Sequence, residues 1–98
     1  MELYIITFKH ANYAVAAYNK LSGYGVRNIR IAQTPFAIKG ECDLCIKAYG
    51  KNALDILLNE SKGKYPVSNV YLETNMDGRT VYKLIPWHKC GHMDHIFL

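Results

Sequence analysis

Two cysteines three residues apart, Cys42 and Cys45, are the side chains of this sequence best suited to chemistry. A thiolate can attack a sulfur donor, bind a metal ion or form a disulfide. In a reducing compartment the Cys-x-x-Cys spacing is typical of a redox pair or half a metal site. On an extended strand, however, the two side chains would point to opposite faces, with Cα atoms about 10 Å apart. That geometry disfavours a disulfide between them.

The C-terminal residues carry further metal-binding side chains. Together with the two cysteines above they form our candidate ligand set for zinc: Cys42, Cys45, Cys90, His88, His92 and His95. Thiolates and imidazoles are the ligands that zinc prefers. The spacing matches no zinc finger, and a histidine-rich terminus is often only solvated. We expect no other cofactor, because the Gly-Tyr-Gly at 23–25 is not a phosphate-binding loop.

The pattern of apolar residues predicts the elements that must position these side chains. Residues 3–8 read as a buried central strand, 10–22 as a helix, 26–32 as an edge strand and 44–49 as a third strand. A second helix is expected over 51–61 with Asn52 as its cap, then strands over 68–74 and 80–85 around a turn at 75–78. The order predicts an α+β fold: a ferredoxin-like βαββαβ antiparallel sheet with two helices on one face and an extra C-terminal hairpin strand.

This topology brings the candidate residues to one edge of the sheet. The first strand ends there, the first helix begins there, and the loop at 34–41 leads into the third strand at the same edge. We therefore expect His10 to lie near Cys42 as a proton partner, and the helix N-terminus to favour a thiolate. The alternative is that Cys42 is only a small buried residue at the start of a strand.

Length and charge restrict the remaining possibilities. The 98 residues predict a single domain, residues 1–86, followed by a tail, residues 87–98, that contains Cys and His. The net charge of +4 is scattered, and no stretch is apolar enough to span a membrane, so neither nucleic acid nor a membrane is an expected partner. Three cysteines are an odd number for a secreted disulfide framework, which favours reduced thiols in the cytoplasm.

From Leu3 to Tyr71 the chain contains a pattern of spaced residues: Phe8, Ala14, Leu21, Pro35, Cys42 and Leu44. They correspond to a strand ending in Phe, a helix with an early alanine, and a proline followed by a Cys-Gly-Leu segment. In this pattern the chain resembles a small bacterial family of selenium/sulfur carrier-like proteins. Asp43 replaces the glycine, Cys45 a small residue, and Phe36 a frequent arginine. The resemblance implies that Cys42 carries sulfur or selenium as a persulfide or perselenide.

Three functions remain open at this point. The first is a carrier, not an enzyme, that docks on a sulfur or selenium donor or acceptor protein and holds the cargo on Cys42. The second is an interaction domain that forms a homodimer through an edge strand or the open sheet face. The third is a small metal-binding module that uses the zinc ligand set.

Overall fold

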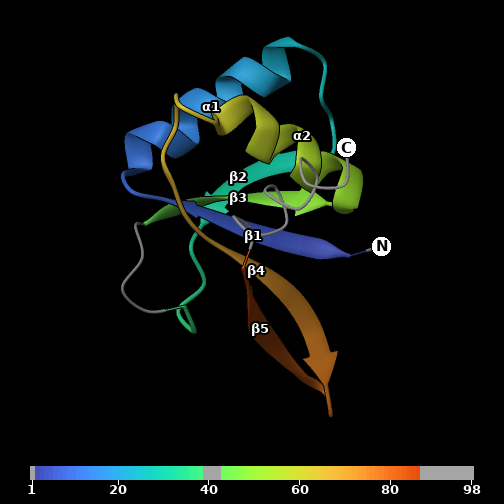
Figure 1. Ribbon diagram of the computed structural model, residues 1–98. Helices are drawn as coiled ribbons and strands as arrows, with labels where there is room; N and C mark the ends of the chain where they lie inside the picture. The colour runs from blue at the N-terminus through green and yellow to red at the C-terminus, as the bar shows by residue number, and fades with distance from the viewer. Residues whose placement is uncertain (1, 39–42, 87–98) are drawn as a thin grey trace.

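The structure is a computed structural model that describes residues 2–38 and 43–86. Its elements follow the chain as β1 (Leu3–Phe8), α1 (Ala11–Gly23), β2 (Ile29–Gln33), β3 (Leu44–Tyr49), α2 (Lys51–Ser61), β4 (Val67–Met76) and β5 (Arg79–Ile85). The strands form one sheet in the order β2-β3-β1-β4-β5, and every neighbouring pair is antiparallel (Figure 1). The predicted α+β class, with two helices and an antiparallel sheet, is confirmed.

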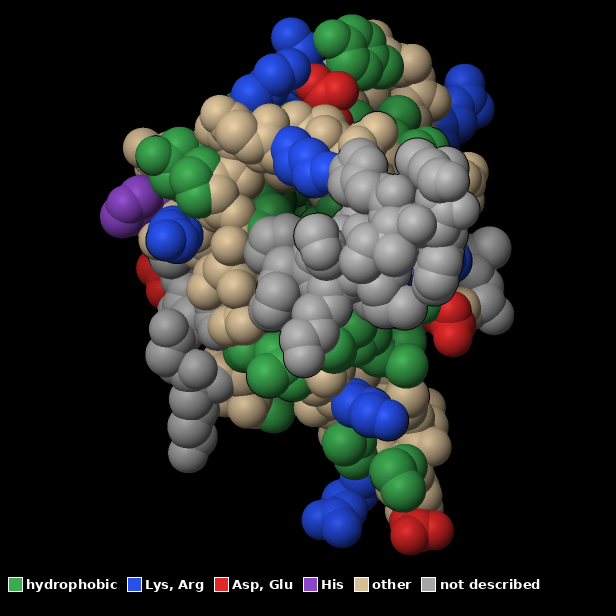
Figure 2. Space-filling model, in the orientation of Figure 1, with side chains coloured by type: hydrophobic (Ala, Val, Ile, Leu, Met, Phe, Trp, Pro, Cys, Tyr) green, Lys and Arg blue, Asp and Glu red, His purple; other side chains and the backbone are tan. Residues whose placement is uncertain are grey.

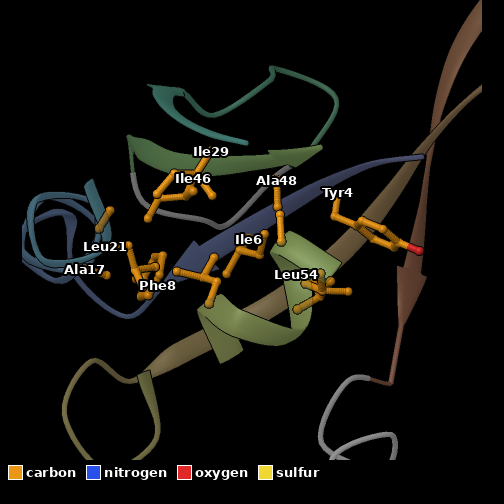
Figure 3. Close-up of a cluster of buried hydrophobic side chains, with 13 residues drawn as sticks. Tyr4, Ile6, Phe8, Ala17, Leu21, Ile29, Ile46, Ala48 and Leu54 are labelled. Carbon is orange, nitrogen blue, oxygen red and sulfur yellow. The ribbon is translucent and has the colours of Figure 1, made fainter. Parts of the chain in front are cut away.

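The main core lies between the sheet and the two helices, which cover the same face (Figure 1). Figure 3 shows Ala17 and Leu21 of α1 and Leu54 of α2 directed toward the strand side chains Ile6, Phe8, Ile29, Ile46 and Ala48. The buried residues of α1, which are Ala14, Ala17 and Leu21, form a stripe of small and apolar side chains that packs against the sheet. Alanines in that stripe let the helix approach the sheet closely.

Strand β1 is the centre of the fold, as its apolar composition predicts. It pairs with β3 on one side and β4 on the other. Residues from Tyr4 to Phe8 are all buried, so both faces of the strand are covered. Its one polar member, Thr7, lies where the ladder to β4 shifts register, between Thr7 and Phe8. There the Thr7 hydroxyl accepts a hydrogen bond from the Asn69 amide at 3.1 Å and donates one to the Asn69 carbonyl at 3.2 Å.

Two local expectations need correction. The predicted cap Asn52 lies inside the first turn of α2, whereas the N-cap is Gly50, whose φ of 99° is a backbone conformation that favours glycine. Strand β2 begins at Ile29, three residues after the predicted Val26. The reason is that the amide of Val26 bonds to the Leu21 carbonyl at 3.1 Å, which places Val26 in the C-terminal cap of α1.

The β4–β5 hairpin is longer than predicted and projects from the body of the molecule (Figure 1). Its turn contains only Asp77 and Gly78, with φ values of 54° and 78°. Two positive φ values are typical of the type I′ turn, whose twist matches that of the strands it joins. The pairing of β1 with β4 ends at Leu3 and Glu73, so the hairpin from Thr74 to Val81 extends beyond β1.

Candidate functional site

The end of β1 and the start of β3 lie side by side, because the two strands are adjacent and antiparallel. This pair of strand ends is the edge of the sheet predicted from the sequence. Cys45 of β3 pairs with Thr7 of β1, and β3 begins one residue earlier, at Leu44. Lys9 and Asp43 therefore leave the ends of two neighbouring strands, which lie about 5 Å apart in a sheet. Helix α1 starts at the same edge, with His10 as its N-cap. Cys42 comes directly before Asp43 in the sequence and lies outside the described residues.

The described residues on either side of Cys42 are held in place. The amide of Thr34 donates to the Asp43 carbonyl at 2.7 Å, and the amide of Ile38 donates to the Pro35 carbonyl at 3.0 Å. Ile38 is only 8% exposed, and it packs with Ile5 and Cys45 on the face opposite the helices.

Cys45 occupies an inert position. Its side chain is 0% exposed, and its thiol donates to the Gln33 carbonyl at 3.8 Å. Burial raises the pKa of Cys45, and a hydrogen bond with Thr34 and the charge of Lys47 only partly oppose that effect. A buried thiol with a raised pKa is a poor nucleophile. Cys45 is also a free cysteine.

His10 lies at the same edge as an exposed residue. Its ring centroid is 5.5 Å from that of Tyr13, with the two planes inclined by 41°, and its carbonyl accepts the Tyr13 amide at 3.0 Å. The first turn of α1 contains no acidic residue. The partial positive charge of this helix end is therefore not neutralised by an acidic side chain of that turn, and it favours an anion placed there.

Most of the zinc ligand set cannot be compared with the structure. Cys42, His88, Cys90, His92 and His95 lie outside the described residues. Within residues 2–38 and 43–86 no group of three or more His, Cys, Asp or Glu side chains could hold a metal ion. Zinc binding by the Cys and His residues stays a prediction.

One exposed aromatic side chain lies in the loop that leads toward this site. Phe36 is fully exposed, at 101%, in the turn that follows Pro35. Its ring is presented by a turn that is anchored through Ile38 and through the bond between Thr34 and Asp43. The position of a large aromatic residue directly after a loop proline was the signal for this exposed ring in the sequence.

The described part of the chain defines a small α+β domain in which Cys45 lies on β3. This chain belongs to the family described as "Putative Se/S carrier protein-like", whose model matches residues 3–72. The match includes β1 to β3, both helices and much of β4, with Cys42 and Cys45 inside it and Cys90 outside. No curated protein matches the chain. No solved structure matches it either. Among the described residues, no helix is long and apolar enough to cross a membrane.

Proposed function

We propose that this protein carries sulfur or selenium between a donor and an acceptor protein, with Cys42 as the thiol that holds the atom. The observation that carries this proposal is the burial of Cys45 inside the region that matches the carrier-like family. Two cysteines lie within that region, and Cys45 is 0% exposed with a raised pKa. Cys42 is therefore the better candidate for a nucleophile.

The transfer step is a thiol exchange at sulfur. The Cys42 thiolate attacks the terminal sulfur of a donor persulfide, a new S–S bond forms on Cys42, and the donor bond breaks to release a donor thiolate. No external oxidant is consumed, because the sulfane sulfur moves with its oxidation state unchanged. Attack by an acceptor thiolate, or reduction of the persulfide, delivers the sulfur. A perselenide would transfer selenium by the same exchange.

The edge of the sheet supports this chemistry in two ways. The N-terminus of α1 offers partial positive charge, which favours the thiolate of a nearby cysteine over its thiol. His10, at the same helix end, is exposed and can exchange a proton with solvent or with the thiol. In this proposal His10 assists deprotonation and Cys42 carries the cargo.

The test is to load purified protein with inorganic polysulfide, remove the excess and measure the intact mass without reductant. We expect a gain of one sulfur atom that dithiothreitol removes. Cys42→Ser should abolish the gain, whereas Cys45→Ala and Cys90→Ser should keep it. Loss of the gain in Cys45→Ala with a retained fold, or persistence of the gain in Cys42→Ser, would assign the cargo to another thiol.

The same mass measurement, made under native conditions on protein purified without added metal, tests the zinc prediction. Stoichiometric zinc that leaves on denaturation would favour the metal-binding module. If the zinc-bound protein also refuses a sulfur load, the carrier proposal is contradicted, because the thiol is then a ligand and not a nucleophile.

We also propose that β1 to β4 and the two helices form a ferredoxin-like unit and that β5 is an addition to it. The order β2-β3-β1-β4 and the antiparallel pairing support this assignment. We further place the protein in the cytoplasm, where a Cys-x-x-Cys pair remains reduced. The free thiol of Cys45 supports that placement.

A further inference from the structure

The projecting hairpin has an exposed edge. Strand β5 is the last strand of the sheet, and no described strand pairs with its outer side. Such an edge presents backbone N–H and C=O groups that can pair with another chain. In Figure 1 the hairpin extends away from the helices, so neither helix covers it.

One face of this hairpin combines positive charge with exposed apolar surface. Arg79, Val81 and Lys83 alternate along β5 and therefore share a face. Across from them on β4 lie Met76, Thr74 and Leu72. Val81 is 39% exposed and Met76 60% exposed, and the two basic residues are exposed as well. Figure 2 shows basic and hydrophobic side chains side by side on the projecting hairpin. We call Arg79, Val81, Lys83 and Met76 the hairpin patch.

Neither Arg79 nor Lys83 forms an ion pair within the described part of the chain. The cross-strand positions opposite Arg79 and Lys83 carry Met76 and Leu72, which are uncharged. The two ion pairs found among described residues, Lys51–Asp55 and Lys64–Glu60, belong to other elements. Glu73 lies opposite Tyr82, on the other face of the hairpin. Burial raises the pKa of Tyr82 most, and the carboxylate of Glu73 raises it further.

The same charges oppose self-pairing of β5 in the register that places Val81 opposite itself. If β5 paired antiparallel with a second copy of itself, centred on Val81, each Arg79 would lie opposite the copy's Lys83. Like charges directly opposite one another destabilise a sheet, and basic residues on an edge strand are a known barrier to self-association. An extended segment with acidic residues at those two positions would instead form two favourable cross-strand pairs.

We propose that β5 binds an extended acidic segment of a partner protein by strand addition. Such a segment carries carboxylates opposite Arg79 and Lys83 and an apolar residue opposite Val81, the pattern Glu-x-Val-x-Glu. The two basic positions are four residues apart, about 14 Å along a strand. Because side chains of a strand alternate between its two faces, only every second residue of the segment faces the patch. Main-chain hydrogen bonds contribute affinity, and the alternating side chains contribute specificity. This proposal does not depend on the role proposed for Cys42.

The test uses the full-length reduced protein and three synthetic peptides in an NMR titration at low salt. The first is acetyl-Thr-Glu-Thr-Val-Thr-Glu-Thr-amide. The second has the same composition in the order Thr-Thr-Glu-Glu-Val-Thr-Thr, so one carboxylate faces away from the patch. The third has Lys in place of Glu. We expect the first peptide to shift the amides of β5, to bind more weakly as salt is added, and to bind at least about threefold more tightly than the second.

A charge-reversed variant completes the test. Arg79→Glu combined with Lys83→Glu should lose binding of the first peptide and gain binding of the lysine peptide, and its amide spectrum reports whether the fold is intact. Unchanged binding of the first peptide by this variant overturns the proposal, as do peptide-induced shifts confined to the helices. Concentration-dependent shifts of β5 without peptide would assign the edge to a second copy of the chain. Stronger shifts with a single-stranded oligonucleotide would assign it to nucleic acid. Either result would contradict the proposal that β5 binds an acidic segment.

Discussion

Thr7 shows how a single polar residue is accommodated in the most buried strand. Its hydroxyl makes both hydrogen bonds to the backbone of Asn69, at the point where β1 and β4 change register. The role of the hydroxyl is therefore structural: it stabilises the point at which the register changes. Thr7→Val keeps the shape and removes both bonds, so we expect it to lower the free energy of unfolding by about 1–3 kcal/mol.

Thr7→Ser is the matched control for that substitution, because it keeps the hydroxyl and loses only a methyl group. Urea unfolding of the two variants should show the larger loss for valine. A valine variant as stable as the serine variant would mean that the bulge does not depend on the hydroxyl.

Cys45 makes the free energy of unfolding depend on pH in the alkaline range. Burial raises its pKa above the ordinary 9.0 in the folded protein. The folded state thus keeps its proton where the unfolded chain has lost it, so the stabilisation is complete below about pH 9 and declines as pH rises. The decline for one such group has a limiting slope of about 1.4 kcal/mol per pH unit.

The measurement is the free energy of unfolding of wild type and Cys45→Ala at several values from about pH 8 to about pH 10, the range in which an unperturbed thiol titrates. Other groups titrate in both proteins and largely cancel in the difference. The wild-type advantage should shrink with rising pH. A constant difference would show that Cys45 titrates alike in the folded and unfolded states.

The turn of the hairpin is an element whose geometry depends on two residues. Asp77 and Gly78 both have positive φ, and a side chain at the second position is strained even though nothing lies within 4 Å of its added Cβ. Gly78→Ala should destabilise the protein by about 1 kcal/mol, since a left-handed conformation is unfavourable for alanine by about that amount. Asp77→Asn should be neutral or slightly stabilising, because Asn-Gly suits this turn equally well.

Thermal unfolding, with the amide shifts of β5 as a local readout, would check this pair of variants. Equal stability of Gly78→Ala and Asp77→Asn would contradict the type I′ assignment. If both variants keep the hairpin shifts of wild type, the turn does not determine the register of β4 and β5.

The sequence predicts elements well where its pattern is long and unbroken. The bounds of β1 and α2 agree with expectation, because an apolar run and a helical stripe each fill the whole element. The start of β2 was wrong, because the chain after α1 forms a cap through Val26 before it extends. The cap of α2 was wrong for a related reason: the positive φ of Gly50 replaces a side-chain cap, and the pattern of polar residues does not reveal backbone conformation.

The sequence allowed the position of the candidate site in the fold to be predicted, but not the contacts between its side chains. Strand order follows from the alternation of elements, so the edge shared by His10 and the start of β3 could be expected. Cys45 is buried on the face of the sheet opposite the helices. The cover that Ile38 provides for that thiol depends on how the loop folds beneath the sheet, and no local pattern encodes such a contact.

At the scale of the whole molecule, the protection of backbone amides against hydrogen exchange should decrease from the centre of the sheet to the hairpin. Strands β1 and β3 have neighbours on both sides, whereas β5 has a described neighbour only on one. Residues from Thr74 to Val81 also extend beyond β1. We expect amide hydrogen exchange to be slowest in β1 and β3 and much faster in this part of the hairpin. Equal protection throughout the sheet would show that the hairpin unfolds only with the core.

The central position of β1 also has a consequence for how the protein is made. Thr7 and its partner Asn69 are 62 residues apart in the sequence. At a synthesis rate of roughly 5–20 residues per second, the ribosome needs several seconds to make that interval. During this time β3, one neighbour of β1, is complete at Tyr49, but β4 begins only at Val67, so one side of β1 waits longer for its partner, and an unpaired apolar strand can associate with other chains. One side of β1 therefore stays unpaired until β4 has been translated.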